Sequence, residues 1–474
     1  MAGAVRDGDR VLSAAATPVV APPGLVGGTL GCPDFRRRRG LRYAYYAGAM
    51  YKGIGSRALV VRMGRAGLLG FLGTGGLRPE EIAADLRGIA ADLGGQGTYG
   101  ANFLASPLDP AAERAAAELL VALEVPHVEA AAFTTVTPDL AWLRARGLQA
   151  GPDGGIVRPR QIVAKLSRPE VAALFLAPAP APLLERLVAA GRLTPEEARL
   201  AAALPLADDL CVEADSGGHT DRGVLGVLLP FIRRQRDEAR RARGWTTPIG
   251  VGAAGGLGTP EAVAAAFTLG ADFVVTGSVN QCTAEAGTSD LAKDLLQTAE
   301  PQDTDLVPAG DMFELGAKVQ VFKRGLLFPG RAKKLYELYR QLDSLDQLDA
   351  RTREQLETRV FGRPLAAVYE ETKAYYLTRR PEVIARAEQD PKHRMALVFR
   401  WYFVHSSRLA RRGDSAGRAD FQIHCGPALG AFNQLVRGTP REDWRHRHVD
   451  EIAGLLMEGA AAVLRERWAA LAAG

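Results

Sequence analysis

Cysteine is scarce in this sequence. The chain of 474 residues contains four cysteines, and they are far apart at Cys32, Cys211, Cys282 and Cys425. No CxxC pair occurs, and no cysteines or histidines are grouped with the spacing of a zinc site. We therefore expect no metal centre and no disulfide framework, and a reducing compartment, the cytoplasm, suits the chain best.

Long apolar segments are also missing. No uncharged apolar run approaches the roughly 18 residues that cross a bilayer, and Asp7 and Asp9 interrupt any signal-like core near the start. Charge is nearly balanced, with 59 Lys and Arg residues against 54 Asp and Glu residues. A nucleic-acid-binding surface would need a concentrated basic patch with aromatic residues. The sequence thus predicts a soluble protein that binds neither membranes nor nucleic acids.

Several familiar cofactor and catalytic motifs are absent. No Gly-Lys dipeptide occurs, which excludes a P-loop, and no HExxH occurs. A GxGxxG pattern that starts at Gly256 fails at Glu261, which excludes a Rossmann fingerprint at that place. One GxSxG match, residues 413–417, follows no predicted strand, so we interpret it as a loop and not as a nucleophile elbow.

Short apolar runs alternate with helical patterns from residue 41 to residue 277. Eight such runs, separated by helices such as 79–93, 109–123 and 260–269, favour parallel pairing with crossover helices. The count predicts an α/β fold, a (β/α)8 TIM barrel, in preference to an open doubly wound sheet. The predicted strands are 41–50, 66–73, 97–104, 127–133, 160–166, 210–214, 247–253 and 272–277.

Composition divides the chain into four parts. Residues 1–25 are rich in Ala, Pro and Gly and are predicted to be a flexible tail. Residues 26–305 form the predicted barrel, and residues 306–420 are charged and helical in pattern, which predicts an added helical region that acts as a lid over the substrate. Residues 421–474 return to apolar sequence and end in a predicted helix, 449–471, that packs on the barrel.

Glycines follow the last two predicted strands. Gly255 and Gly256 come after the seventh strand, and Gly277 and Ser278 come after the eighth. In TIM barrels these two loops commonly bind phosphate through backbone N–H groups and a helix N-terminus. The alternative interpretation is that both loops are simply tight turns that bind no ligand. Because two such loops follow adjacent strands, we favour a phosphate site.

Other predicted strand ends carry residues suited to a flat ring. Small residues around Met50 would line one ring face, Asn102 would contact a ring edge, and Lys165 would stabilise negative charge on a reduced ring. Each residue alone is equally explained as core or capping, but together they favour flavin mononucleotide over a sugar phosphate. The predicted cofactor-binding residues are Gly48, Ala49, Met50, Asn102, Lys165, Gly217, Gly218, Gly252, Ala254, Gly255, Gly256, Gly277 and Ser278.

The stretch EADSGGHTDRG, residues 213–223, follows the sixth predicted strand. Gly217 and Gly218 remove side chains where another group must come close. His219 follows them, and its near-neutral pKa suits proton donation. A lone histidine is more often structural, yet its place at the catalytic end of a barrel strand favours a role in handling substrate or cofactor.

Several blocks of the sequence carry a family resemblance over about residues 25–474. The chain resembles the FMN-dependent PfaD-like proteins, which are related to nitronate monooxygenases and to the flavin-dependent enoyl-acyl-carrier-protein reductase. The most specific blocks are EADSGGHTD (213–221), DMFELG (311–316), QVFKRG (320–325) and FQIHCGPALGAFN (421–433). His424 stands in the last block, where we expect a tryptophan in the family.

The resemblance implies an enoyl reductase that works in trans for a polyketide or polyunsaturated fatty acid synthase. Hydride would pass from NADPH to FMN and on to an enoyl chain tethered to acyl carrier protein. His219 matches the histidine of the family's GGH motif and is the expected acid or orienting donor, and Lys165 falls at a position expected to contact the ring. Monomer and homodimer both stay open.

A basic segment, residues 322–334, has two interpretations. It is either a solvated helix start or a docking surface for the acidic carrier protein, formed by Lys323, Arg324, Lys333 and Lys334. Two other functions also stay open. One is a nitronate monooxygenase-like flavin oxidase acting on a small substrate, although a small nitronate needs no helical lid. The other is a flavin-holding subunit without catalysis of its own.

Overall fold

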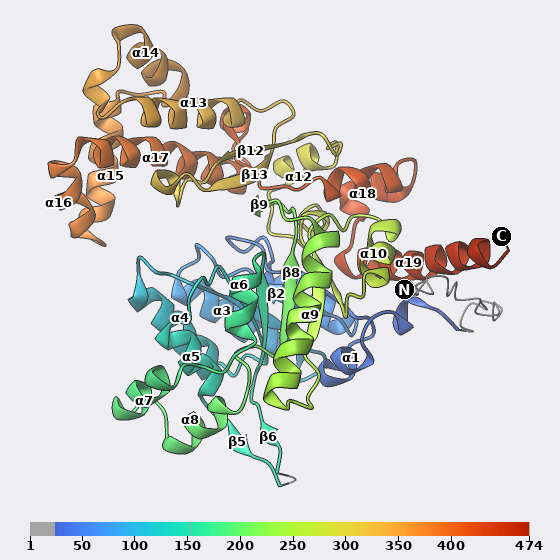
Figure 1. Cartoon of the computed structure of the whole chain (residues 1–474). Coiled ribbons are helices and arrows are strands. Elements are labelled where there is room, and N and C mark those ends of the chain that lie inside the picture. Colours follow the sequence, from blue (N-terminus) through green and yellow to red (C-terminus); the bar gives the residue numbers. More distant parts are fainter. Residues whose placement is uncertain (1–23, 153, 474) are drawn as a thin grey trace, which may run out of the picture.

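Eight parallel strands close into a barrel in the computed structural model, which describes residues 24–152 and 154–473 (Figure 1). The predicted TIM barrel is therefore confirmed, and each predicted strand overlaps one observed strand. Almost all of the expected flexible tail, 1–25, lies outside the described residues. In their order around the barrel the strands are β1 (Tyr45–Ala47), β2 (Leu69–Leu72), β3 (Gly100–Leu104), β4 (His127–Ala131), β7 (Gln161–Leu166), β8 (Asp209–Glu213), β10 (Gly250–Ala254) and β11 (Val274–Thr276). Of these, β8 begins one residue earlier and β10 ends one residue later than predicted.

Helices surround this barrel, and proline begins many of them. Pro79, Pro110, Pro138, Pro169 and Pro260 each stand at the first helical position, where the missing N–H costs nothing. The helices that cover the barrel are α1 (Pro33–Arg39), α2 (Arg57–Arg65), α3 (Pro79–Leu93), α4 (Pro110–Ala122), α5 (Pro138–Ala145), α6 (Pro169–Phe175), α9 (Leu225–Arg243) and α10 (Pro260–Thr268). Two further helices, α7 (Ala181–Ala189) and α8 (Pro195–Ala202), pack on the outside of α5. The short hairpin β5 (Gln149–Ala150) and β6 (Ile156–Val157) lies beyond them.

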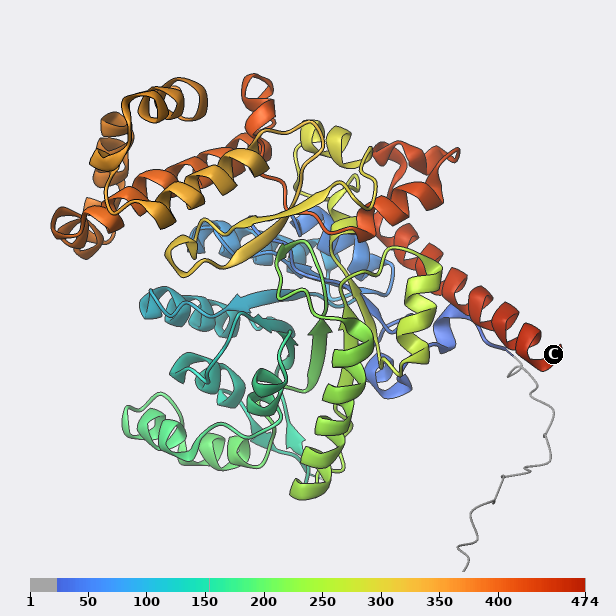
Figure 2. The same ribbon diagram turned by 45° about the horizontal axis from the view of Figure 1, so that its top comes forward.

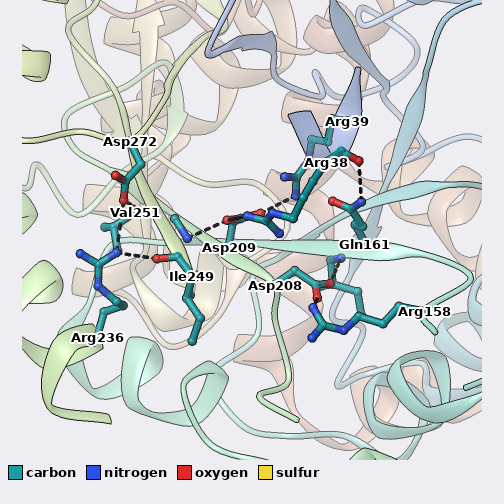
Figure 3. A network of polar contacts seen from close by, with 12 residues as sticks. Arg38, Arg39, Arg158, Gln161, Asp208, Asp209, Arg236, Ile249, Val251 and Asp272 are labelled. Atoms are coloured by element: carbon teal, nitrogen blue, oxygen red, sulfur yellow. Dashed lines mark hydrogen bonds and ion pairs between the residues drawn. The ribbon is translucent and has the colours of Figure 1, made fainter. Parts of the chain in front are cut away.

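A buried charge network ties the N-terminal ends of the strands together (Figure 3). Asp208 pairs with Arg144 at 2.9 Å and with Arg158 at 2.8 Å, and Asp209 pairs with Arg38 and Arg39. Burial alone would raise the pKa of Asp208, but the two arginines outweigh it and hold that pKa well below its ordinary value. Because this network is at the end of the barrel opposite the predicted site, it serves the fold.

The added region differs from the sequence prediction at its start. The helical pattern expected from residue 306 is wrong for the first part, because β12 (Thr304–Pro308) and β13 (Lys318–Phe322) form an antiparallel hairpin with Leu306 opposite Gln320. Polar and apolar residues alternate in Lys318–Phe322, which is a strand pattern that the charged sequence around it obscured. A third strand, β9 (Gly218–His219), pairs with β13.

Helices follow the hairpin and stand to one side of the barrel's C-terminal end (Figures 1 and 2). They have an apolar core of their own, in which Phe313, Phe328, Phe399 and Phe403 pack together. The predicted helical region is therefore confirmed for this part. Its helices are α13 (Phe328–Gln341), α14 (Ala350–Gln355), α15 (Leu365–Leu377), α16 (Pro381–Gln389) and α17 (Pro391–Arg412).

The chain then returns to the barrel. After residues 421–427 come α18 (Ala428–Val436) and α19 (Val449–Ala473), and α19 packs against α10 and α2. Gly459 permits this close packing, since a methyl group there would lie 2.6 Å from the Pro260 ring. The expected final helix on the barrel is thus present. Two short helices, α11 (Ser278–Gln281) and α12 (Asp290–Leu296), lead from β11 toward the added region. Among the described helices, none has the length and apolar character needed to cross a bilayer.

Candidate active site

The predicted site residues gather at the C-terminal ends of the barrel strands. Parallel strands place all their carboxyl ends at one mouth, which is where TIM-barrel enzymes carry their chemistry. Between this mouth and the added region lies β9, which carries His219 (Figure 1). The residues brought to this end are Gly48, Ala49 and Met50 after β1, Asn102 in β3, Lys165 in β7, Gly217, Gly218 and His219 after β8, Ala254, Gly255 and Gly256 at the end of β10 or after it, and Gly277 and Ser278 after β11. The predicted Gly252 is different: it is the middle residue of β10, where a methyl group would lie 2.2 Å from the Phe273 ring, so it packs in the barrel core.

His219 is held by the added region. Val319 of β13 is its partner in the strand register, and its Nε2 lies 3.1 Å from Oδ1 of Asp311. The His219 side chain is 49% exposed and that of Asp311 is 66% exposed. The hydrogen bond to Asp311 raises the pKa of His219 above its ordinary value against the smaller effect of burial, and the charges of Asp311 and Glu213 act in the same direction. The protonated ring is therefore favoured.

A second histidine stands close by. His424, in the returning segment, forms a strand bridge with Val321, and its Nε2 accepts a hydrogen bond of 3.0 Å from the Gln422 amide. The ring of Tyr51 stacks on it with 5.9 Å between centroids. Burial lowers the pKa of His424 to about 4, and the charge of His219 adds to this. Of the two histidines, His219 is therefore the one whose protonated form is favoured by its surroundings.

The two glycines before His219 have identifiable reasons in the fold. A methyl group on Gly217 would lie 2.8 Å from the Gly426 nitrogen, so the bare backbone lets the returning segment approach. Gly218 has φ +81°, a left-handed conformation that favours glycine. Close approach of the chain to itself explains Gly217, and the predicted contact of both glycines with a cofactor ring stays a prediction.

The two predicted phosphate loops lie on neighbouring strands, as β10 pairs with β11. Gly255 fills a tight turn, since a methyl group there would lie 2.7 Å from the carbonyl carbon of Ala214. Gly256 and Gly277 differ, because a methyl group at either would meet no atom within 4 Å. The Ser278 oxygen accepts a 3.0 Å hydrogen bond from the Gly426 N–H, and its hydroxyl donates to no group among the described residues. Open space and a free donor fit a phosphate group.

Asn102 uses only one end of its amide within the protein. Its Oδ1 accepts hydrogen bonds from the backbone N–H and the hydroxyl of Thr74, each of 2.7 Å. Its Nδ2 donates to no group in the described part of the chain. The side chain is thus oriented by Thr74, with an amide donor left at the barrel mouth. A polar ring edge would fit this donor.

Lys165 lies between two carboxylates. Its Nζ is 3.6 Å from Glu129 Oε1 and 3.4 Å from Glu213 Oε1. Burial would lower the pKa of Lys165, but the charges of Glu213 and Glu129 outweigh it and raise that pKa. The Glu129 side chain is fully buried, and neither of its oxygens makes a hydrogen bond of normal geometry with any described residue. Burial raises the pKa of Glu129 despite the nearby ammonium group.

Two residues of this site were not predicted from the sequence. Glu129 is the only acid in the apolar stretch 127–133, and a charge in a buried strand was an available signal. Asp311 lies some 90 positions from His219, with which it forms a hydrogen bond, and no spacing rule relates the two. Only the fold of the β12–β13 hairpin brings them together.

The predicted basic docking residues are not all free. Lys333 Nζ is 2.6 Å from Asp305, and Arg324 donates to the Thr298 carbonyl at 2.8 Å. Lys323 and Lys334 are exposed and form no ion pair with any described residue. If this surface binds a partner, these two lysines are its most available charges.

Family models match two parts of the chain. Residues 41–313 match the nitronate monooxygenase model, and this range takes in most of the barrel and its mouth. Residues 342–421 match the inserted helical domain of [acyl-carrier-protein] S-malonyltransferase. The second match falls on the helices of the added region, from the end of α13 onward.

Individual proteins match the chain over almost all of its length. Polyketide biosynthesis protein PksE of Bacillus subtilis is 49% identical over 94% of this chain, and ThaF of Burkholderia thailandensis is 51% identical over 93%. The chain spans 58% of PksE and 37% of ThaF.

A solved structure matches as well. The enoyl reductase domain of MlnA, from the macrolactin biosynthesis cluster of Bacillus amyloliquefaciens, superposes with a TM-score of 0.90 at 40% identity. The match covers 94% of this chain and 99% of that domain. Barrel and added region are therefore shared as one unit.

Proposed function

Because the chain belongs to the nitronate monooxygenase family of oxidoreductases, and within it to the PfaD-like enoyl reductases, we propose that it reduces enoyl thioesters with FMN and NADPH. The substrate would be tethered to the acyl carrier protein of a polyketide or polyunsaturated fatty acid synthase, and the enzyme would act in trans. One observation carries the proposal. His219 stands at the mouth of the barrel in a hydrogen bond with Asp311, beside the glycine loops of β10 and β11.

The residues present fit FMN. Gly256 and Gly277 leave room for a phosphate, Ser278 has a hydroxyl hydrogen to donate, and the Asn102 amide is available to a ring edge. When bound, FMN would supply the transfer of hydride from NADPH to the enoyl β-carbon. The other proposed contacts are those of Gly48, Ala49, Met50, Lys165, Gly217, Gly218, Ala254 and Gly255.

His219 would supply the proton for the α-carbon. Its protonated form is favoured by Asp311, and its half-exposed ring is accessible from the mouth of the site. General acids of this kind contribute roughly 100- to 10,000-fold to a rate. Lys165, held by Glu129 and Glu213, would provide fixed positive charge at the end of β7.

A carrier protein as partner is supported by the added region. Residues 342–421 match the helical insert of a malonyltransferase whose name includes the acyl carrier protein. Exposed Lys323 and Lys334 border the same region and would attract an acidic partner. A small nitronate would use neither feature, so the nitronate oxidase stays the second candidate.

The test is a purified protein mixed with its proposed substrates. We expect a yellow chromophore that is bleached anaerobically by NADPH, and recovery of the colour on addition of a crotonyl thioester with release of the butyryl product. His219→Gln should keep the chromophore and its bleaching by NADPH, while the thioester step slows by roughly 100-fold or more.

A protein that binds no flavin would contradict the proposal. Faster turnover of a nitronate with oxygen would favour the second candidate, and unchanged thioester reduction in His219→Gln would remove this residue as the acid.

A further inference from the structure

The β12–β13 hairpin organises both histidines of the site. One edge of β13 pairs with β12, while Val319 pairs with His219 and Val321 forms the bridge to His424. β13 is therefore the structural link between a residue that follows β8 and a residue of the returning segment. The hairpin belongs to the active site as much as to the added region.

The loop that joins the two strands of the hairpin is anchored on both sides of Asp311. The Ala309 N–H donates to the Ala317 carbonyl at 2.8 Å, and Arg400 of α17 donates to the Gly310 carbonyl at 2.9 Å. On the other side, Phe313 is buried among the aromatic residues of the helical core. The Asp311 carboxylate is exposed, but the backbone that carries it is fixed.

We propose that Asp311 is a positioning residue for His219, which it orients by accepting the Nε2–H of the ring. This inference rests on the proposed function, in which His219 donates a proton. With Nε2 held by Asp311, the second nitrogen, Nδ1, forms no hydrogen bond to any described residue. A neutral ring then presents a lone pair at Nδ1, and a protonated ring presents an N–H there. The hairpin thus leaves Nδ1 as the nitrogen available to the substrate, and it favours the protonated form of the ring.

The charged and titratable groups around His219 support the same direction. Asp311 faces it from the hairpin loop and Glu213 from the end of β8, and both favour the protonated ring. His424, from the returning segment, would oppose it if it were charged, but burial keeps that ring neutral above a pKa of about 4. Lys52 lies near His424 and helps to keep it neutral.

A surface contact without function is the alternative explanation of this hydrogen bond. Both side chains are about half exposed or more, and solvent screening weakens such pairs. An acyl chain covering the mouth would exclude water and strengthen the pair. The two explanations differ in what removal of the carboxylate does to the titration of His219 and to the proton-dependent step.

The direct test is an NMR titration of the protein labelled at its histidine rings, with His219→Gln used to assign the His219 signal. In Asp311→Asn we expect the pKa of His219 to fall, because the hydrogen bond and the charge that raise it are lost. Glu314→Gln is the matched control, since Glu314 lies in the same loop and pairs with another histidine, His393, at 2.9 Å. An unchanged His219 titration in Asp311→Asn, or an equal change in Glu314→Gln, would overturn the inference.

The second measurement is the pH profile of crotonyl thioester reduction. Activity that needs protonated His219 is present below its pKa and is lost as the pH rises through it. Since Asp311→Asn lowers that pKa, the loss should move to lower pH, and kcat near pH 8 should fall about tenfold, less than removal of a general acid costs. Asp311→Glu, which keeps the charge, should recover part of the rate.

The two proposals fail in different ways. If no variant and no wild-type protein reduces the thioester, the proposed function is wrong, and the NMR titration still decides whether Asp311 holds the His219 proton. If wild type is active and Asp311→Asn matches it at every pH, the positioning role is overturned while the function stands.

Discussion

At the scale of single residues, the buried charges beneath the mouth of the barrel are the most consequential. Lys165 Nζ lies 3.6 Å from Glu129 and 3.4 Å from Glu213, and the buried Tyr46 side chain is another polar neighbour of Glu129. The ammonium group is thus the main compensation for an acid buried in an apolar strand. Buried acids without a cation are costly, so this lysine has a structural task besides any contact with a cofactor.

Lys165→Met should therefore destabilise the protein. We expect the free energy of unfolding in urea to fall by roughly 3 kcal/mol. This is the lower end of the range for a buried ion pair that loses one partner, and we choose it because Lys165 is 20% exposed. The loss should be greater at alkaline pH than at pH 6, since without Lys165 the pKa of Glu129 rises further and its ionisation is disfavoured in the folded state.

The double variant Lys165→Met with Glu129→Gln separates the pair from the rest of the site. It should recover much of the lost stability and remove the pH dependence, because no acid is left to ionise at position 129. A double variant whose loss equals the sum of the two single losses would show that Lys165 and Glu129 are not coupled.

At the scale of elements, strands with a clear hydrophobic pattern were predictable and the hairpin of the added region was not. All eight barrel strands and helices such as 79–93 follow from apolar runs and proline positions. β9 has two residues and β13 has five, in charged or glycine-rich sequence, so neither offers a long enough pattern. Their pairing depends on contacts about 100 positions apart in the chain, which local sequence does not encode.

The same distinction explains the candidate site. His219, Asn102 and the glycines after β10 and β11 could be proposed from the sequence because they lie at or after the ends of recognisable strands. Asp311 and Glu129 were not predicted because the role of each depends on a partner from another part of the chain. Asp311 is brought to His219 by the pairing of β9 with β13, and Glu129 is brought to Lys165 by the pairing of β4 with β7. Residues positioned by a strand end were predictable, and residues defined by a tertiary partner were not.

The basic segment at the start of α13 carries a prediction of its own. Charge reversal at both exposed lysines, Lys323→Glu and Lys334→Glu, should raise the KM for a carrier-bound enoyl substrate and leave the KM for a small thioester analogue unchanged. Lys333 is left intact, because its ion pair with Asp305 would confuse the result. Steering by surface charge weakens with salt, so the difference should shrink as ionic strength rises.

The control for this variant is Arg186→Glu. Arg186 is exposed on α7, at the opposite end of the molecule from the added region (Figure 1). It should change neither KM. Equal increases for carrier-bound and small substrates in the lysine variant would mean that this surface affects the site itself and does not dock the carrier protein.

At the scale of the whole molecule, the barrel and the added region have separate apolar cores, and both contribute residues to the proposed site. The barrel supplies the glycine loops, Asn102 and Lys165, while the hairpin supplies Asp311 and the pairing of His219. The helices α13 to α17 stabilise that hairpin through Phe313 and Arg400. The added region therefore does more than cover the substrate, because the proposed proton donor depends on it.

A deletion of the helices tests this dependence. The Leu327 N–H donates to the Ala419 carbonyl at 2.7 Å, so the ends of the helical segment meet and a short Gly-Ser linker can replace residues 328–418 while keeping β12, β13 and residues 421–474. We expect the shortened barrel to bind FMN, as checked by absorbance and circular dichroism. Its kcat for a small thioester should fall about as far as that of Asp311→Asn, since Phe313 and Gly310 lose their anchors. Asp311→Asn in the shortened protein should then have little further effect, whereas a second, full loss would show that the loop is held by the hairpin alone and that the helices serve only the partner.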